Sequence, residues 1–226
     1  CEHAGVNTIV GVPGQLPIVQ EYNQGYEGHF QSITMVNSRE QVDEAVRGGA
    51  RALYIIGNHC DWQVRDGKVD ELARLLDYMH EQDLPAGLGA HSIQALEACE
   101  KAGLEPDFFV KTLHHDRYWS AHPKENRIPF SVDTKKSPDH DHFHDNLFCL
   151  FPDRTIEFMK SQSPPWIAFK VLAAGAIPPE DGFAYAFDNG ADFLCVGMFD
   201  FQVVADANTA VQAFGAAQAR SRPWQG

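Results

Sequence analysis

The chain has 226 residues, of which 31 are acidic and 18 are basic, so its formal net charge is −13. This surplus of acid argues against nucleic acid or an anionic membrane surface as the main partner, because both require clustered lysine and arginine. No stretch approaches the roughly 18 uninterrupted apolar residues of a membrane span. The five cysteines are widely scattered, which favours a reducing compartment, and we expect a cytoplasmic protein.

Seven short apolar runs have the composition of strands that are buried on both faces, because they lack regular polar alternation. They span residues 8–12, 30–37, 52–57, 85–90, 107–113, 166–173 and 192–198. Helical patterns lie between them, and three of these patterns end in glycine shortly before the next run. The sequence therefore predicts an α/β fold with an all-parallel sheet.

Several of the expected helices have identifiable ends. A capping-box pattern begins at Ser38 and predicts a helix that ends at Gly48. Further helices are expected over 69–79, from Ser92 to Gly103, from 178 to Gly190 and over 205–219.

Five of the strands start at residues 8, 30, 52, 85 and 107, the regular spacing of successive β/α units. This spacing favours a parallel (β/α) TIM-type barrel that forms one domain over residues 1–226. Seven strands are visible where such barrels have eight, and Cys1–Gly5 resembles the end of a helix. Either the first strand lies upstream of Cys1 or the barrel closes with seven strands.

Residues 114–153 interrupt this spacing with a long segment that has no apolar period. Loops of this length in a compact domain are usually functional or disordered, and we interpret this one as a lid-like insertion over the catalytic face. Three alternating histidines near its end indicate a disordered tract with weak metal affinity: His140, His142 and His144.

Two lysines lie inside predicted strands, Lys111 in Phe-Phe-Val-Lys-Thr and Lys170 in Ile-Ala-Phe-Lys-Val. A buried ammonium is costly, so each is paired, neutralised by a lowered pKa, or used in chemistry. A neighbouring cation also lowers the pKa of a lysine and frees its amine to form a Schiff base. The alternative is that one or both point outward and extend between helices to solvent.

Other polar residues follow the predicted strands, where the catalytic groups of barrels lie. His91 and His114 are candidates for proton transfer, and Asp200 is either a general base or a cap of the next helix. Substrate contacts are expected from Asn58, His115 and the ring of Trp119, which has the chemistry to pack against a sugar face.

Residues 107–112, 169–177 and 190–197 resemble the last three strands of class I aldolases of the deoxyribose-phosphate aldolase type. The resemblance implies a Schiff base on Lys111 and a tuning or proton-relay role for Lys170, without a cofactor. It also implies substrate contacts at Gly175, in the turn that binds phosphate in that family, and at Gly197. The net charge of −13 disfavours phosphate at this turn and favours neutral sugars.

The histidines support a competing hypothesis. His59, His91 and His114 follow three consecutive predicted strands, and Asp61 lies beside the first. Three imidazoles and a carboxylate on one face would suit zinc, manganese or iron. Alternatively, these histidines hydrogen-bond substrate hydroxyls or each other.

The leading hypothesis is a lyase that acts on a carbonyl-bearing, carbohydrate-like small molecule, with Lys111 and Lys170 as its central residues. The second is a divalent-metal lyase, isomerase or hydrolase, and the third is a non-catalytic barrel subunit. A homo-oligomer is compatible with the sequence.

Overall fold

The computed structural model describes residues 1–130 and 148–225. Seven strands form one parallel sheet in the order of the chain. The strands are β1 (Thr8–Gly11), β2 (Gln31–Val36), β3 (Ala52–Ile55), β4 (Ala86–Ala90), β5 (Phe108–Thr112), β6 (Trp166–Phe169) and β7 (Phe193–Cys195). All seven predicted strands are present. The first five are slightly shorter than their apolar runs, and β6 and β7 are about half as long as theirs.

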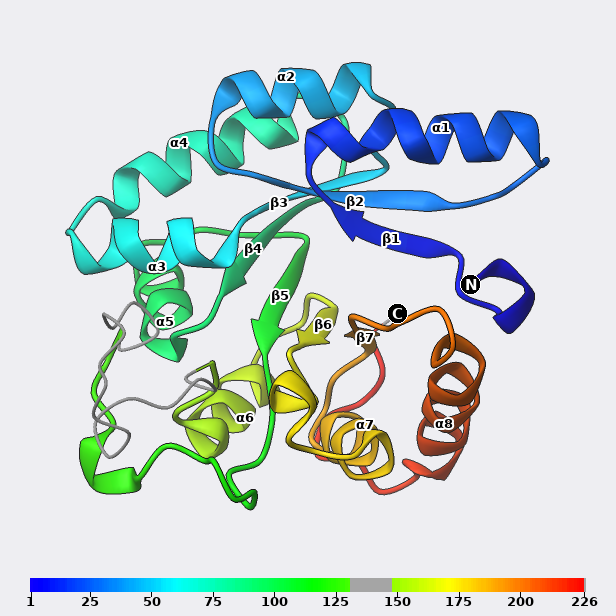
Figure 1. Cartoon of the computed structure of the whole chain (residues 1–226). Helices are drawn as coiled ribbons and strands as arrows, with labels where there is room; N and C mark the ends of the chain where they lie inside the picture. Colours follow the sequence, from blue (N-terminus) through cyan, green and yellow to red (C-terminus); the bar gives the residue numbers. More distant parts are fainter. Residues whose placement is uncertain (131–147, 226) are drawn as a thin grey trace, which may run out of the picture.

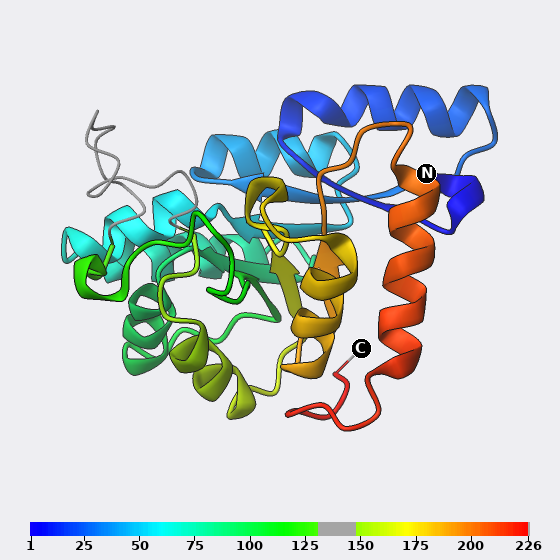
Figure 2. The same cartoon turned by 60° about the horizontal axis from the view of Figure 1, so that its bottom comes forward.

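Helices lie outside the curved sheet (Figures 1 and 2). They are α1 (Leu16–Gly25), α2 (Arg39–Arg47), α3 (Gly57–Arg65), α4 (Val69–His80), α5 (Ile93–Lys101), α6 (Pro152–Lys160), α7 (Pro179–Asp188) and α8 (Val203–Ala216). Short 3-10 turns complete the described chain: η1 (Glu2–Ala4), η2 (Pro13–Gln15), η3 (Lys124–Asn126) and η5 (Ala173–Gly175). The architecture is a nearly closed α/β TIM-type barrel, as the sequence predicted.

Helix α2 forms as its capping pattern predicts. The Ser38 hydroxyl accepts a hydrogen bond from the Gln41 amide, and the Gln41 side chain accepts one from the Asn37 amide. Asn58 follows the end of β3 as expected, and it lies in the first turn of α3. Helices α1, α3 and α6 were not predicted, since none has a sharp capping box at its start.

Side-chain alternation divides the core into two layers. Inside the barrel, Tyr54, Phe108, Val110 and Ile167 form a small apolar cluster. The opposite faces of the strands pack under the helices in a larger cluster that includes Trp166. Strand residues of one parity therefore line the barrel, and those of the other parity face the helices.

The sheet does not close by hydrogen bonding within the described part of the chain. The pairings run from β1 to β7 without a ladder between these two edge strands. Ile9 of β1 and Phe193 of β7 are correspondingly exposed. Closure with seven strands, one of the two expectations, is therefore not what the structure shows.

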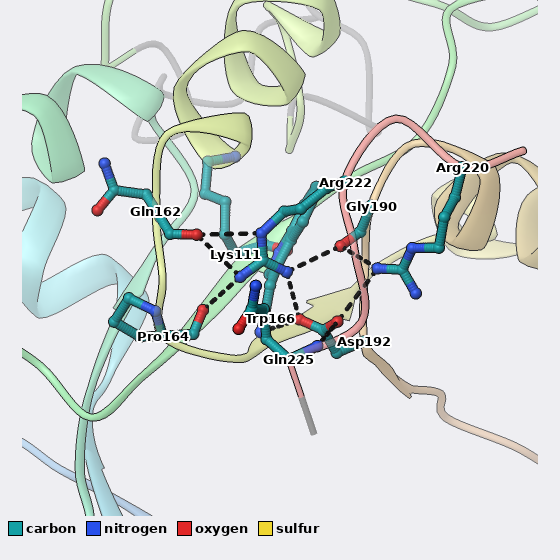
Figure 3. Close-up of polar contacts among 9 residues, drawn as sticks. All are labelled: Lys111, Gln162, Pro164, Trp166, Gly190, Asp192, Arg220, Arg222 and Gln225. Atoms are coloured by element: carbon teal, nitrogen blue, oxygen red, sulfur yellow. Dashed lines mark hydrogen bonds and ion pairs between the residues drawn. The ribbon is translucent and has the colours of Figure 1, made fainter.

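The C-terminal segment is bound at the amino-terminal ends of β6 and β7 (Figure 3). The buried Asp192 carboxylate pairs with Arg220 and Arg222 and accepts hydrogen bonds from the backbone amides of Trp166 and Gln225. The Arg222 guanidinium also donates to three main-chain carbonyls, those of Gln162, Pro164 and Gly190. No helix among the described residues has the length and apolar character to cross a membrane.

Candidate functional site

A cavity of about 500 Å³ opens at the carboxyl-terminal ends of the strands. Five strands contribute to its wall through Val10, Met35, Tyr54, Phe169 and Cys195. Loop and helix residues that follow the strands complete it, among them Asn58, His91 and Lys170. Barrel enzymes carry their catalytic groups at this end, so this cavity is the candidate site.

Lys170 lies at the edge of this cavity with its side chain half-buried. Its Nζ is 3.5 Å from the centre of the Phe148 ring and 5.8 Å from that of Phe169. Burial lowers the pKa of Lys170 to about 8, although the Asp61 charge opposes the shift. An appreciable fraction of this amine is therefore neutral near physiological pH, as a nucleophilic lysine requires.

The turn that carries Lys170 is strained. Strand β6 ends at Phe169 because Lys170 adopts a left-handed backbone conformation with φ of 56°. Ala173 and Ala174 are also left-handed, with φ of 45° and 56°. Each such residue costs on the order of 1–2 kcal/mol relative to ordinary backbone conformations, and strain of this kind clusters at functional sites. The sequence predicted Lys170 in the interior of a strand, whereas the structure places it directly after the end of β6.

Asp61 and His91 form a buried pair beside the cavity. His91 Nδ1 donates to Asp61 Oδ2 over 2.9 Å, and the backbone amides of His91 and Ser92 donate to the same carboxylate. Burial lowers the pKa of His91 despite this hydrogen bond. The ring is thus held as the neutral tautomer with its proton on Nδ1, which leaves Nε2 as a proton acceptor.

Helix α3 brings Asp61 and Asn58 to this position. A Cβ on Gly89 would lie 2.6 Å from the Ile55 carbonyl oxygen and 3.0 Å from the Gly57 nitrogen. Glycine at 89 therefore allows the start of α3 to pack directly on β4. Asn58 then faces the cavity, and Asp61 lies one turn deeper beneath His91.

Lys111 does not line this cavity. It has the strand parity of Phe109, which belongs to the outer layer, and it is fully buried against Phe151 and Thr155 at the start of α6. Figure 3 shows its side chain directed to the α6 side of the sheet. Burial lowers the pKa of Lys111. The two lysines therefore do not line the same cavity: Lys170 faces the cavity inside the barrel, and Lys111 faces the α6 side of the sheet.

The Lys111 ammonium nevertheless contacts the framework of the site. Its Nζ donates to the hydroxyl and the carbonyl oxygen of Thr112 at 2.7 and 2.9 Å. The Thr112 hydroxyl is 2.5 Å from the Phe148 carbonyl oxygen and 3.2 Å from that of His91. The Thr112 hydroxyl thus links Lys111 to the main chain at His91 and at Phe148, whose ring contacts the Lys170 amine.

The residues predicted to bind a metal do not converge. Only His91 and Asp61 meet. His59 is near Glu71 of α4, and burial lowers its pKa. His114 bonds through Nδ1 to the His115 carbonyl oxygen, and burial lowers its pKa to about 4. Among residues 1–130 and 148–225, no group of three or more histidine, cysteine or carboxylate side chains is arranged to hold a metal ion.

Other predicted site residues also lie away from the cavity. His115 packs edge-on against Tyr185 of α7, and the Trp119 side chain is 85% exposed. Gly175 forms the left-handed turn before α7, with φ of 87°. Gly197 follows β7 in an exposed segment.

Asp200 is neither a cavity residue nor a helix cap, because its carboxylate accepts from the Phe201 amide and the N-cap of α8 is Gln202. The segment 114–153 is described only in part, as residues 114–130 and 148–153. Arg127 ties the two parts together through Asp116 and the Leu150 carbonyl oxygen, and the Phe130 amide donates to the Ser92 hydroxyl of the barrel. The tract with His140, His142 and His144 lies outside the described residues.

Sequence reasoning did not single out the other residues of the cavity wall, among them Tyr54, Phe148 and Cys195. Strand parity could have identified Tyr54 and Cys195, whose pKa values are both raised by burial so that the hydroxyl and thiol remain protonated. Phe148 lies within the insertion at 114–153 and carries no local signal.

A larger cavity, of about 820 Å³, lies at the opposite end of the barrel and beside the gap between β1 and β7. Its wall is mainly apolar, with Ile9, Phe193 and Val203 among its residues, and it contains neither lysine nor histidine. The amino-terminal end of a barrel usually serves stability, so this cavity is not the candidate reaction site.

No protein-family model matches the chain, and no curated protein sequence matches it. Its fold is similar to that of a putative aldo-keto reductase from Pseudomonas aeruginosa, with a TM-score of 0.58, 16% identity, and coverage of 92% of this chain and 78% of that one. It is also similar to Yersinia pestis dihydropteroate synthase, with a TM-score of 0.51, 13% identity, and coverage of 94% and 83%. At these identities the likeness extends to the TIM-type barrel fold alone.

Proposed function

We propose that this protein is an aldolase-like lyase that forms an imine between Lys170 and a carbonyl-bearing, carbohydrate-like small molecule. The observation that carries the proposal is the meeting, in one cavity, of a half-buried amine with a pKa of about 8 and an imidazole oriented by a buried carboxylate. The resemblance to class I aldolases supports lysine chemistry, but the geometry favours Lys170 over Lys111 as the reacting amine.

In the proposed reaction, the neutral Lys170 amine attacks the carbonyl carbon, and the carbonyl oxygen leaves as water. His91 Nε2 then removes the proton of a hydroxyl two carbons from the imine carbon. The bond between the hydroxyl-bearing carbon and the carbon next to the imine carbon breaks. Its electron pair forms the enamine, and the hydroxyl-bearing carbon leaves as an aldehyde. The proton returns from His91 to the enamine carbon, and water hydrolyses the imine to free Lys170.

The remaining residues support this chemistry without reacting. Asp61 holds the proton on Nδ1 and stabilises the imidazolium that forms when Nε2 takes a proton. The Asn58 side chain and the protonated Tyr54 hydroxyl are the polar groups on the wall for orienting substrate oxygens. No step requires a metal or an organic cofactor.

A non-catalytic barrel would have strand-end groups with ordinary pKa values. The lowered pKa values of Lys170 and His91, together with the strained turn at 170, favour a reacting site. The arrangement of the described histidines offers no comparable support for metal chemistry.

Borohydride trapping tests the proposal. The purified protein is incubated at pH 8 with glyceraldehyde or acetone, reduced, and mapped by peptide mass spectrometry. We expect a reduced adduct on Lys170 that persists in Lys111→Met and in the exposed control Lys160→Met and is absent in Lys170→Met. An adduct on Lys111 instead, or none on either lysine, would reject this assignment.

A further inference from the structure

We infer that the cavity at Lys170 is specific for an uncharged carbonyl compound with an apolar body, such as an aromatic or alkyl aldehyde or ketone, over a phosphorylated or carboxylated one. This inference rests on the proposed imine chemistry and replaces its carbohydrate-like substrate with a more apolar one. The substrate would be an aldehyde or ketone with an aromatic or alkyl body that keeps the hydroxyl needed for the proposed cleavage. Three features of the cavity carry it: its apolar wall, its single cation and the buried carboxylate behind it.

Apolar and aromatic side chains make most of the wall. Six of its lining residues are Met35, Tyr54, Ile56, Trp62, Phe148 and Phe169. Trp62 is 39% exposed, so part of its aromatic surface is uncovered. A ligand with a flat apolar body would remove this surface from water, and aromatic pairs add to the gain.

The only basic side chain of lysine or arginine type on the described wall is Lys170, and no acidic side chain lies on that wall. In an imine, the Lys170 nitrogen is bonded to the substrate and is no longer a separate cation for a phosphate or carboxylate. An anionic substrate would therefore need a second cation, which the described wall does not contain. Sites that select phosphate or carboxylate generally supply arginine or lysine for this purpose.

The first turn of α3 is the one feature that favours an anion, because helix amino termini present free amides. The Asn58 side-chain oxygen already accepts from the His59 amide. The Asp61 carboxylate lies farther along the same helix, beneath His91, and repels negative charge. These two features leave room for a neutral oxygen at this turn and disfavour a phosphate.

The size of the cavity agrees with this class. Its volume of about 500 Å³ lies within the range of roughly 300–1,000 Å³ typical of small-molecule sites. A single aromatic ring with a short carbonyl chain fits without filling the opening.

A comparison of trapping rates for three probes tests the inference. Benzaldehyde, glyceraldehyde and glyceraldehyde 3-phosphate are each reduced onto the protein with cyanoborohydride at pH 8. Each rate at Lys170 is divided by the rate of the same probe with N-acetyl-lysine amide, which corrects for intrinsic reactivity. We expect the corrected rate for benzaldehyde to exceed that for the phosphate by about tenfold or more, with neutral glyceraldehyde between them.

Two variants check the physical cause. Trp62→Ala should reduce the advantage of benzaldehyde, whereas Trp119→Ala, which removes an exposed tryptophan away from the cavity, should not. Met35→Arg adds a cation that cannot form an imine and should raise the corrected rate for the phosphate. Thermal unfolding of each variant establishes that it is folded.

The outcomes separate the two proposals. Equal or faster reaction of the phosphate at Lys170 overturns the substrate class and leaves the imine chemistry standing. Equal rates for benzaldehyde and glyceraldehyde overturn the apolar preference. If no probe gives an adduct at Lys170, the proposed function itself fails.

Discussion

Asp61 and His91 are 30 residues apart in the sequence, yet the Asp61 carboxylate accepts the Nδ1 proton of His91 over 2.9 Å. The carboxylate also accepts the backbone amides of His91 and Ser92, so it fixes both the ring and the chain that carries it. This relationship sets which nitrogen of His91 is available at the cavity.

Asp61→Asn should slow proton transfer by His91 while leaving imine formation on Lys170 intact. The amide cannot stabilise an imidazolium, and general acid–base groups contribute about 10²- to 10⁴-fold. The measurement is the rate at which acetone exchanges its methyl hydrogens in D₂O, together with borohydride trapping of the same sample. The exposed Asp66→Asn is the matched control. Unchanged exchange in Asp61→Asn would contradict the role given to the pair.

Imine formation should depend on pH through Lys170. Burial lowers its pKa to about 8, so the neutral fraction of the amine, and with it the trapping rate, should rise up to about pH 8 and then level off. N-acetyl-lysine amide, with an ordinary lysine pKa of about 10.4, should continue to gain reactivity above that pH. If the trapping rate at Lys170 instead rises up to pH 10, as that of N-acetyl-lysine amide does, burial does not lower the pKa of Lys170.

Lys111→Met should alter the pH dependence of stability. Burial lowers the pKa of Lys111 in the folded state, so the unfolded chain binds more protons between that pKa and the ordinary value of about 10.4. The free energy of unfolding contributed by this group therefore rises with pH across that window and falls as pH is lowered. The variant should lose this contribution.

Urea denaturation of the native protein and Lys111→Met between pH 7 and 10 measures the difference. Lys101→Met, at the exposed end of α5, is the control. If the free energy of unfolding changes with pH in the same way for the native protein and Lys111→Met, Lys111 keeps its proton in both the folded and the unfolded state over this range.

Asp192→Asn should destabilise the protein without affecting Lys170. Two buried arginines, Arg220 and Arg222, would lose their shared carboxylate, and removing one partner of a buried ion pair costs about 3–5 kcal/mol. The midpoint of urea denaturation should fall, whereas the pH profile of trapping at Lys170 should not move. Asp188→Asn, an exposed change on α7, is the control; an equal midpoint for both variants would argue against the ion cluster as a stabilising unit.

Much of the fold followed from local patterns. The apolar runs that became β4 and β5 contain residues buried on both faces, and a fully buried parallel strand has a recognisable continuous composition. Ser38 began its helix because capping is a contact between neighbours in sequence. Helix α3 was missed because it starts at Gly57 without a capping side chain, held by its packing on Gly89.

For the site, the polar residues that follow the predicted strands identified Asn58 and His91, and the composition of two strands identified Lys111 and Lys170 as unusual lysines. Which lysine faces the cavity depends on strand parity and on the left-handed backbone at Lys170, and both arise from the packing of β5 and β6 against their neighbours. His91 is paired with Asp61 because α3 packs against β4. This is a long-range contact, and the residues next to His91 or Asp61 in the sequence do not indicate it. Side-chain chemistry is a local property of the chain, whereas direction, partner and pKa come from the environment that only the packed barrel creates.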